Sequence, residues 1–94
     1  MAYIEHMAEE KVNIYNYLDY QQYLREFYEW RKSENKAFSY RFMGQRVGLD
    51  AGFLVKVLQG KLNISLKSIP RIARFCRLEK DERLYFEYLV RFAR

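Results

Sequence analysis

The sequence predicts an all-helical domain, and three observations support this prediction. Apolar residues recur at intervals of three and four along almost the whole chain of 94 residues, which is the spacing of an amphipathic helix. The sequence lacks the sustained alternation of apolar and polar residues that a half-buried strand requires. It also lacks an internal repeat and a linker rich in Pro, Gly or Ser. We therefore expect a single five-helix bundle.

The first long helix is expected over residues 20–34. Asp19 is a suitable N-cap, and Gln22 stands three positions later, where it can complete a capping box. Leu18 precedes the cap and is spaced to contact Tyr23 as a hydrophobic staple. These signals together fix the expected start of the helix.

The sequence also predicts how this helix ends and where the helical domain begins. Asn35 suits a left-handed residue at the C-terminal end, because its short polar side chain tolerates a positive φ. Residues 1–12 carry no start or stop signals. We expect a loose leader over residues 1–13, followed by one helical domain over residues 14–94.

Two short helices are expected next, over residues 40–47 and 51–59. Each begins after a residue whose side chain can accept hydrogen bonds from the first backbone amides, and each ends at a glycine. These start and stop residues are Ser39, Gly48, Asp50 and Gly60.

The last two helices are expected over residues 66–77 and 80–92. Ser65 can cap the earlier one, but Pro70 at its fifth position lacks an amide donor, so the start can slide toward Ser68. The later helix has two carboxylates, Asp81 and Glu82, at the positive end of its dipole.

Composition narrows the function classes. One cysteine and one histidine give no disulfide, no cysteine zinc site and no acid–base or nucleophile arrangement. We therefore expect a protein that is not an enzyme and needs no cofactor or metal. Charged residues interrupt every stretch before the roughly 20 apolar residues that a membrane helix needs, and we expect a cytoplasmic protein.

Charge is concentrated in the middle of the chain. Residues 38–78 hold eight Lys or Arg and one acidic residue, whereas residues 1–37 hold five against seven. A positive excess gathered in one segment is typical of a surface that faces a polyanion. The alternative is that these are ordinary solvated helix faces.

Residues 39–60 have the spacing of a helix-turn-helix. Two short helices are separated by Gly48, Leu49 and Asp50, and a tight turn with a glycine is typical of helices that cross steeply. The second helix of such a motif can enter the major groove of DNA. Gly44 would cost roughly 1 kcal/mol inside a helix relative to Ala, so we expect the two helices to approach closely there.

The stretch SYRFMGQRVGLDAGFLVKVLQGKLNISLKSIPRIARFCRL resembles the helix-turn-helix of the Cro and phage-repressor type. Met43 and Gly44 match its Leu-Ala pair, and Val47 and Gly48 match its apolar-Gly turn. Residues 14–93 as a whole are similar to the N-terminal part of a bacterial family first noted as a set of Fibrobacter paralogues. The resemblance implies a DNA-binding or regulator-like module, and members of that family typically carry a further C-terminal region.

The resemblance implies a set of residues that contact double-stranded DNA. They come from the start of the first short helix, from the second short helix and from the loop that follows: Ser39, Tyr40, Arg41, Ala51, Gly52, Phe53, Val55, Lys56, Gln59, Lys61 and Asn63. The amides at both helix N-termini are further candidates for phosphate oxygens. Cations near in sequence that could share this face are Arg41, Lys56, Lys61, Lys67, Arg71 and Arg74.

The sequence departs from the repressor pattern where bases are read. Among the exposed early positions of the second short helix, Ala51 to Lys56, only Lys56 can donate a hydrogen bond from its side chain. We expect recognition to depend on phosphate contacts and DNA shape. Alternatively, the apolar face of this helix binds protein without specific DNA binding.

Aromatic residues are unusually abundant, with nine Tyr, seven Phe and one Trp. They lie on more faces of the first and last helices than one small core is expected to fill, and exposed rings are enriched in protein interfaces. We expect these helices to contact a second copy, as a homodimer, or a C-terminal regulatory region. The expected interface residues are Tyr20, Tyr23, Trp30, Tyr85, Tyr88 and Phe92.

Overall fold

The computed structural model describes residues 12–93, and every regular element in that range is helical. The α-helices are α2 (Tyr20–Glu34), α3 (Tyr40–Val47), α4 (Ala51–Leu58), α5 (Ile69–Phe75) and α6 (Lys80–Phe92). Two 3-10 turns, η1 (Ile14–Asn16) and η2 (Leu66–Ser68), precede α2 and α5. The predicted all-helical class is confirmed for this part of the chain.

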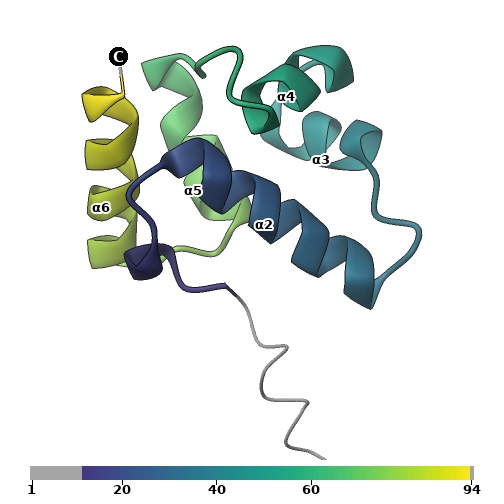
Figure 1. Ribbon diagram of the computed structural model, residues 1–94, viewed down its shortest axis with the longest axis horizontal. Coiled ribbons are helices and arrows are strands. Elements are labelled where there is room, and N and C mark those ends of the chain that lie inside the picture. The colour runs from purple at the N-terminus through teal and green to yellow at the C-terminus, as the bar shows by residue number, and fades with distance from the viewer. Residues whose placement is uncertain (1–11, 94) are drawn as a thin grey trace, which may run out of the picture.

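The longest helix, α2, is the central element. In Figure 1 it crosses the front of the molecule, with α5 behind it, α6 at one end and α3 toward the other. It contacts both α4 and α6, while α5 contacts both α3 and α6. η1 packs on α6, so the first and last described elements lie together.

The core between these helices consists largely of aromatic rings. Tyr20, Tyr23 and Phe27 are fully buried on one face of α2. Phe86 of α6 meets the two tyrosines edge-on, with ring centroids 6.1 and 6.3 Å apart, and Phe75 of α5 lies 5.9 Å from Phe27. Edge-to-face packing of this kind fills a small core with few, large side chains.

The predicted N-caps of the first three α-helices are confirmed. Asp19 accepts a hydrogen bond from the Gln21 amide at 2.9 Å, Ser39 accepts one from the Phe42 amide at 3.0 Å, and Asp50 caps α4 in the same way. Each cap is a contact between residues two or three positions apart, which the local sequence fixes.

Two other expectations for the start of α2 are wrong. Gln22 does not complete a capping box, because its amide nitrogen donates to the Glu26 carboxylate at 3.1 Å. Leu18 is 90% exposed and forms no staple, while Tyr23 is buried against α6. Because Tyr23 packs into the aromatic core, it does not contact Leu18 at the start of the helix.

Asn35 after α2 is also not left-handed. Its φ is −148°, an extended conformation, and its side-chain oxygen accepts a hydrogen bond from the Ala37 amide at 3.0 Å. The residue thus begins a polar turn, which Asn favours as an alternative to the left-handed cap.

The expected helix over residues 66–77 is shorter and begins differently. Pro70 occupies the first turn of α5, and the chain enters through η2, as the expected slide toward Ser68 required. Ser65 makes no cap bond to the backbone; its hydroxyl lies 3.2 Å from that of Ser68. At the other end Arg77 has a φ of 58° and its amide donates to the Arg74 carbonyl, which ends the helix early.

The remaining boundaries agree with expectation to within one residue, with α4 ending at Leu58 and α6 matching residues 80–92. A contact that was not predicted, from the Glu79 amide to the Glu82 carboxylate at 2.8 Å, helps to begin α6. Residues 1–11 of the expected leader lie outside the described residues, but Val12 packs against the core and Asn13 caps η1. No helix within residues 12–93 combines the length and apolar character needed to cross a bilayer.

Candidate nucleic-acid interface

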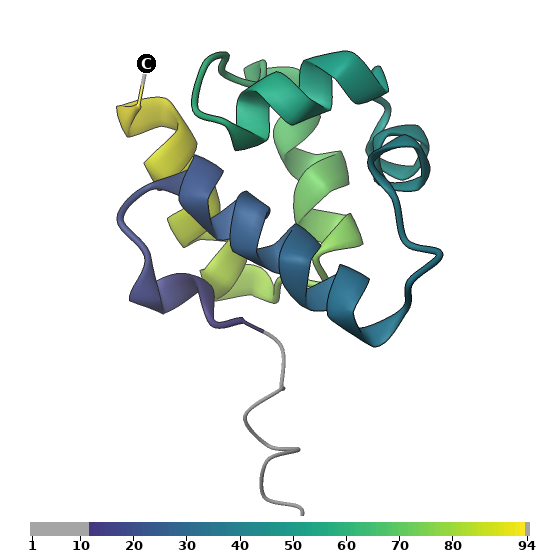
Figure 2. The same ribbon diagram turned by 45° about the vertical axis from the view of Figure 1, so that its right-hand side comes forward.

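The candidate site is built on the crossing of α3 and α4. In Figure 2, α3 is seen nearly end-on while α4 runs across the view, so the two axes cross steeply. A Cβ atom at Gly44 would lie 2.5 Å from the Leu49 carbonyl oxygen and 3.5 Å from the Ala51 nitrogen. The expected close approach at Gly44 is therefore confirmed, and only glycine permits it.

The turn between the two helices is held by backbone and cap contacts. Gly48 ends α3 with a φ of 77°, a conformation that favours glycine. The Leu49 amide donates to the Gly44 carbonyl at 2.8 Å. Asp50 then accepts hydrogen bonds from the Gly52 and Phe53 amides at 2.9 and 3.3 Å, which starts α4 at a fixed position.

α2 fixes the other end of α4 and the loop beyond it. The Arg25 guanidinium donates to the Leu58 carbonyl at 2.9 Å, and the Gln21 amide group donates to the Leu62 carbonyl at 2.7 Å. The Tyr20 hydroxyl donates to the Asn63 side-chain oxygen at 2.8 Å. α4 is therefore anchored at both ends, by the Asp50 cap and by α2.

Some of the predicted contact residues are exposed. We call the predicted contact residues that are exposed on α4 and in the following turn the α4 ridge; they are Gly52, Lys56, Gln59 and Lys61. Arg41 of α3 is exposed as well. The cationic members of the predicted set are thus accessible to a ligand.

Other predicted contact residues are engaged within the molecule. Ala51, Phe53 and Val55 are only partly exposed, and Phe53 packs against the core. Tyr40 stacks on Tyr28, with ring centroids 4.1 Å apart. Ser39 caps α3 and Asn63 is bonded to Tyr20, as described above.

The expectation that both helix N-termini offer open amides needs correction. At α4 the Gly52 and Phe53 amides are occupied by the Asp50 carboxylate. At α3 the Phe42 amide is occupied by Ser39. A phosphate approaching the start of α4 therefore meets a carboxylate, which repels it.

The basic residues of α5 do not simply extend the α4 ridge. Arg71 and Arg74 line a surface depression together with Arg31 of α2 and Arg46 of α3. Arg71 donates from Nε to the Arg46 carbonyl at 3.2 Å. Lys67 lies in η2 and is exposed outside this depression.

The aromatic residues that were expected to bind a partner differ in their exposure. Tyr20 and Tyr23 are fully buried in the core and cannot form an interface, because the small core takes more rings than expected. Trp30 and Tyr85 are partly buried; the first packs on Phe27, and the second donates a hydrogen bond to the Tyr17 carbonyl. Tyr88 and Phe92 are 57% and 76% exposed and stack on each other.

The sequence analysis did not predict that Arg31 and Arg46 lie in the same surface depression as Arg71 and Arg74. Arg31 and Arg46 are on different helices, 15 positions apart, and no local motif joins them.

Within residues 12–93, His, Cys, Asp and Glu side chains form no group of three that could hold a metal ion.

Comparison with protein-family models, with curated proteins and with solved structures gives no match to this chain.

Proposed function

We propose that this chain is the DNA-binding helix-turn-helix module of a bacterial transcriptional regulator. The observation that carries the proposal is the steep crossing of α3 and α4, closed at Gly44. A pair of short helices joined in this way leaves the second helix on the outside, where its width matches the major groove.

Binding in this proposal depends mainly on phosphate contacts and on DNA shape. Arg41, Lys56 and Lys61 are exposed and supply the positive charge, and each cation that reaches a phosphate adds about 0.9 to the slope of log affinity against log salt. Lys56 of α4 and Gln59, which follows the helix, are exposed side chains that can bond base edges. Few base contacts of this kind give weak sequence preference.

The experiment measures binding of unrelated short DNA duplexes by fluorescence anisotropy at several salt concentrations. We expect binding that weakens steeply as salt rises, and the double change Arg41→Glu and Lys56→Glu should abolish it. Far-UV circular dichroism should remain unchanged, because both side chains are exposed.

A matched control carries Lys80→Glu and Arg83→Glu, which make the same charge change on α6, at the end of the molecule away from α3 (Figure 1). This control should retain most of the binding. Equal loss in both double variants would show that only net charge matters, and absence of binding at low salt would refute the proposal.

The alternative, a protein-interaction or dimerisation module, is favoured by one specific feature of α6. Leu84, Tyr88 and Phe92 are spaced four residues apart and are 57%, 57% and 76% exposed. Residues at this spacing share one helix face, and a second copy of the chain could cover it. Dimeric helix-turn-helix proteins bind paired half-sites, so the two functions are compatible.

Sedimentation equilibrium tests this surface. The double change Tyr88→Ser and Phe92→Ser should convert a dimer to a monomer, whereas Tyr15→Ser, a change of another exposed ring, should leave the mass unchanged. A wild-type chain that is monomeric at high concentration would exclude the homodimer.

A further inference from the structure

A depression of about 360 Å³ on the surface of the molecule is lined by five arginines and two phenylalanines. The arginines come from three helices and the turn after α5: Arg31, Arg46, Arg71, Arg74 and Arg77. We call this the arginine pocket. Its volume lies in the range of small-molecule sites, roughly 300–1,000 Å³, and no carboxylate is among its lining residues.

Several of these arginines are held in place by contacts that leave donors available. The Arg31 guanidinium lies over the Phe38 ring at 4.8 Å and the Phe75 ring at 5.8 Å, and that of Arg46 lies over Phe42 at 5.1 Å. A guanidinium stacked on a ring keeps its N–H groups directed outward in its own plane. This geometry suits bidentate binding of phosphate oxygens.

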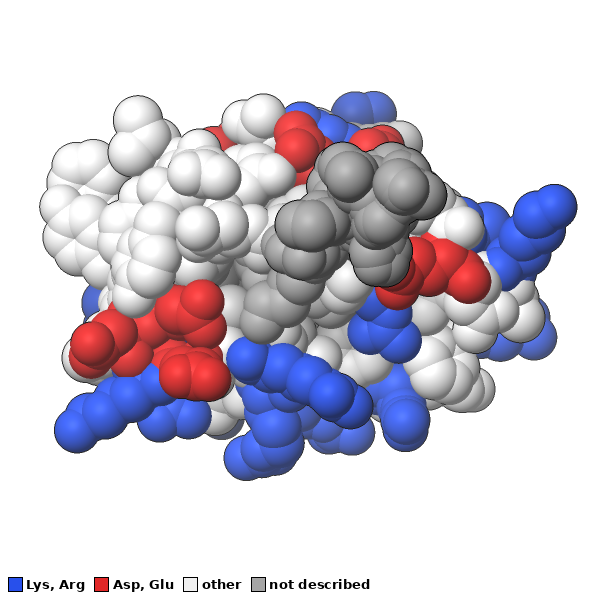
Figure 3. Space-filling view, turned by 90° about the horizontal axis from the view of Figure 1, so that it is seen from below, with Lys and Arg blue, Asp and Glu red and all other residues white. Residues whose placement is uncertain are grey.

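Four of the arginines in the pocket form no ion pair with an acidic residue of the described chain. Within residues 12–93, Arg31, Arg46, Arg71 and Arg74 have no carboxylate oxygen within 4 Å. Like charges gathered in one depression repel each other, and a bound polyanion would relieve this repulsion. Figure 3 shows that Lys and Arg side chains gather along the lower edge of the face in view, with groups of Asp and Glu beside them.

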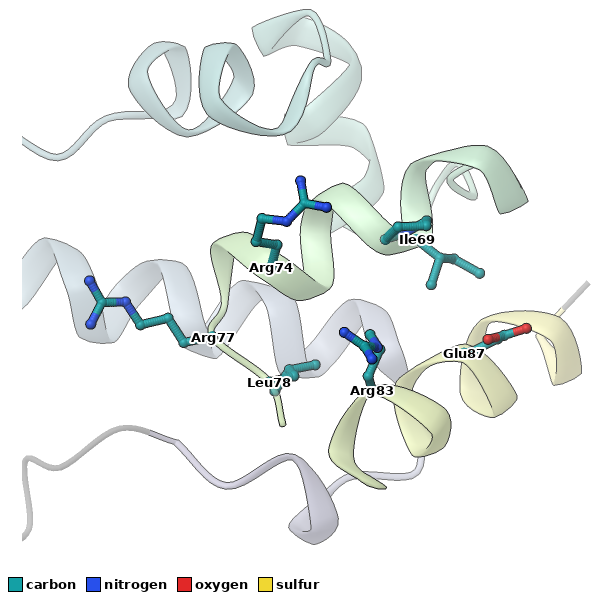
Figure 4. A pocket seen from close by; sticks show the side chains of 7 residues that line it. Ile69, Arg74, Arg77, Leu78, Arg83 and Glu87 are labelled. Atoms are coloured by element: carbon teal, nitrogen blue, oxygen red, sulfur yellow. The ribbon is translucent and has the colours of Figure 1, made fainter. Parts of the chain in front are cut away.

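A neighbouring depression provides a contrast. It shares Arg74 and Arg77 but also contains Arg83 and Glu87 (Figure 4), and Glu87 pairs with Arg91 at 2.9 Å. In Figure 4, Arg74 points away from α6, whereas Arg83 and Glu87 come from that helix. A further depression, which shares Arg31 and Arg77 with the arginine pocket, contains Glu34. Both neighbouring depressions thus include a carboxylate, whereas the lining of the arginine pocket includes none.

The backbone at the edge of the pocket is unusual as well. Arg77 adopts a φ of 58°, and it is the one described residue other than glycine with a positive φ. Glycine is preferred at this position after a helix, and a larger residue costs roughly 1–2 kcal/mol there. The conformation belongs to the end of α5, because the Leu78 amide donates to the Ala73 carbonyl and the Arg77 amide donates to the Arg74 carbonyl. It fixes the direction in which the chain leaves the pocket.

We propose that the arginine pocket binds a small ligand that carries adjacent phosphate groups, as a diphosphate or triphosphate chain. Arg31, Arg46, Arg71 and Arg74 would bind the phosphate oxygens. The site is concave and shares no residue with the α4 ridge or Arg41. It adjoins the proposed DNA surface, because the Arg71 side chain lies against Gly48 in the α3–α4 turn. The inference goes beyond the DNA-binding function and does not depend on it.

The test is isothermal titration of the whole chain with sodium tripolyphosphate, ATP and sulfate at matched ionic strength. We expect tripolyphosphate to bind more tightly than sulfate and to raise the melting temperature, because a ligand of the native state stabilises it. Equal affinity for ATP and tripolyphosphate identifies the phosphate chain as the whole recognised group. Tighter binding of ATP shows that the nucleoside adds contacts, for which Phe42 and Phe75 are placed.

Matched variants locate the site. Arg46→Gln with Arg74→Gln should weaken tripolyphosphate binding about tenfold or more, whereas Lys56→Gln with Lys61→Gln, an equal loss of charge on the α4 ridge, should change it less than about twofold. If the variant with both Arg46→Gln and Arg74→Gln does not fold, Arg74→Gln alone can replace it in the binding test. Arg74 makes no side-chain hydrogen bond within the described residues, so this single change should not disturb the fold. Arg74→Lys should restore only part of the affinity, because it keeps the charge but not the planar fork.

Three results would overturn the inference. One is that the wild-type chain binds tripolyphosphate no better than sulfate. Another is equal weakening by both pairs of substitutions. The third is loss of duplex binding in the pair Arg46→Gln and Arg74→Gln with retention in the pair Lys56→Gln and Lys61→Gln, which would assign the arginines to the DNA surface. The DNA proposal fails separately, through absence of duplex binding by the wild-type chain.

Discussion

Two tyrosines on the same face of α2 are equally buried but chemically different. The Tyr20 hydroxyl donates to Asn63 at 2.8 Å and accepts from the Ile64 amide at 3.0 Å. The Tyr23 hydroxyl is buried without an oxygen or nitrogen partner within the described residues, and its polar neighbour is the Cys76 thiol, a weak acceptor. Burial raises the pKa of Tyr23, and the Cys76 thiol beside it raises that pKa further. The hydroxyl of Tyr20 thus connects α2 to the loop after α4, whereas that of Tyr23 faces only the weakly polar Cys76 thiol.

Replacing each tyrosine by phenylalanine should therefore have opposite effects. Tyr20→Phe removes two hydrogen bonds from a buried site and should lower the free energy of unfolding by about 1–3 kcal/mol. Tyr23→Phe removes a buried hydroxyl whose polar neighbour is only a weak acceptor, the Cys76 thiol, and should be neutral or stabilising by up to about 1 kcal/mol. Urea denaturation of the two variants checks this, and equal destabilisation by both would contradict it.

Tyr17 makes the fold sensitive to alkaline pH. Its hydroxyl donates to the Glu26 carboxylate at 2.6 Å. Burial, followed by this bond and the charge of Glu26, raises the pKa of Tyr17 from 10.0 to about 12. A raised pKa in the folded state means that the stabilising contribution of Tyr17 is complete below pH 10 and is lost as pH rises toward 12.

We accordingly expect the free energy of unfolding to fall across this pH window, and Tyr17→Phe to reduce the fall. Urea midpoints on either side of the window measure the effect, and the ultraviolet absorbance of tyrosinate reports the ionisation itself. An unchanged pH dependence in Tyr17→Phe would show that other tyrosines account for all of the loss.

At the scale of elements, the orientation of α4 depends on Gly44. A side chain there would meet the Leu49 carbonyl, a backbone atom that cannot move independently of the turn. The turn contains Gly48, whose positive φ sets the direction of the chain as it enters α4. The two glycines thus act together, one by its lack of a Cβ and the other by its backbone conformation.

Gly44→Ala should push α3 and α4 apart and cost about 2–3 kcal/mol or more of stability. Gly52→Ala is a suitable control, because Gly52 is exposed and its nearest contact would be the Asp50 carboxylate at 3.1 Å; its effect should stay within about 1 kcal/mol. Thermal unfolding compares the two. If Gly44→Ala is as stable as the control, the crossing is looser than its contacts indicate.

Local contacts explain which helix boundaries could be predicted from the sequence. Asp19, Ser39 and Asp50 bond to amides two or three positions away, and Gly48 adopts the φ expected of it, so neighbouring residues suffice. The staple of Leu18 and the left-handed conformation of Asn35 failed because the aromatic core and a polar turn compete with them. The packing of Tyr23 depends on tertiary contacts, and the Asn35 turn depends on which of two hydrogen bonds its side chain forms. The spacing of residues in the sequence does not reveal either.

The candidate sites likewise divide into residues that a local motif predicts and residues that only tertiary packing brings together. Lys56 and Lys61 were predicted from their place in a local motif, and both are exposed. The arginine pocket could not be predicted, because Arg31, Arg46 and Arg74 come together only when α2, α3 and α5 pack. Tyr20 and Tyr23 were assigned to an interface because spacing alone does not say how many rings a core will hold.

At the scale of the whole molecule, the described chain measures 43 × 28 × 20 Å along its principal axes. α6 stands at one end of it and α3 lies toward the other, as Figure 1 shows. The exposed apolar face of α6 is therefore remote from Arg41 on α3, and a partner could cover it without blocking Arg41. The arginine pocket joins α2, α3 and α5, so a ligand bound there would touch the helix that precedes the α3–α4 turn.

The contact between η1 and α6 has a kinetic consequence. The Tyr85 hydroxyl donates to the Tyr17 carbonyl at 2.5 Å across 68 positions of the chain, and closing so long a loop carries a large entropy cost early in folding. We expect this contact to form after the rate-limiting step. Tyr85→Phe should then speed unfolding about fivefold while changing the folding rate less than about twofold.

Stopped-flow fluorescence of Trp30 can follow both rates, and Tyr88→Phe, which alters an exposed hydroxyl, is the control. A slower folding rate in Tyr85→Phe would instead place the joining of the two chain ends in the folding nucleus. In the expected case, the contact between η1 and α6 determines the lifetime of the native state, because it slows unfolding. It leaves the rate at which the chain folds nearly unchanged.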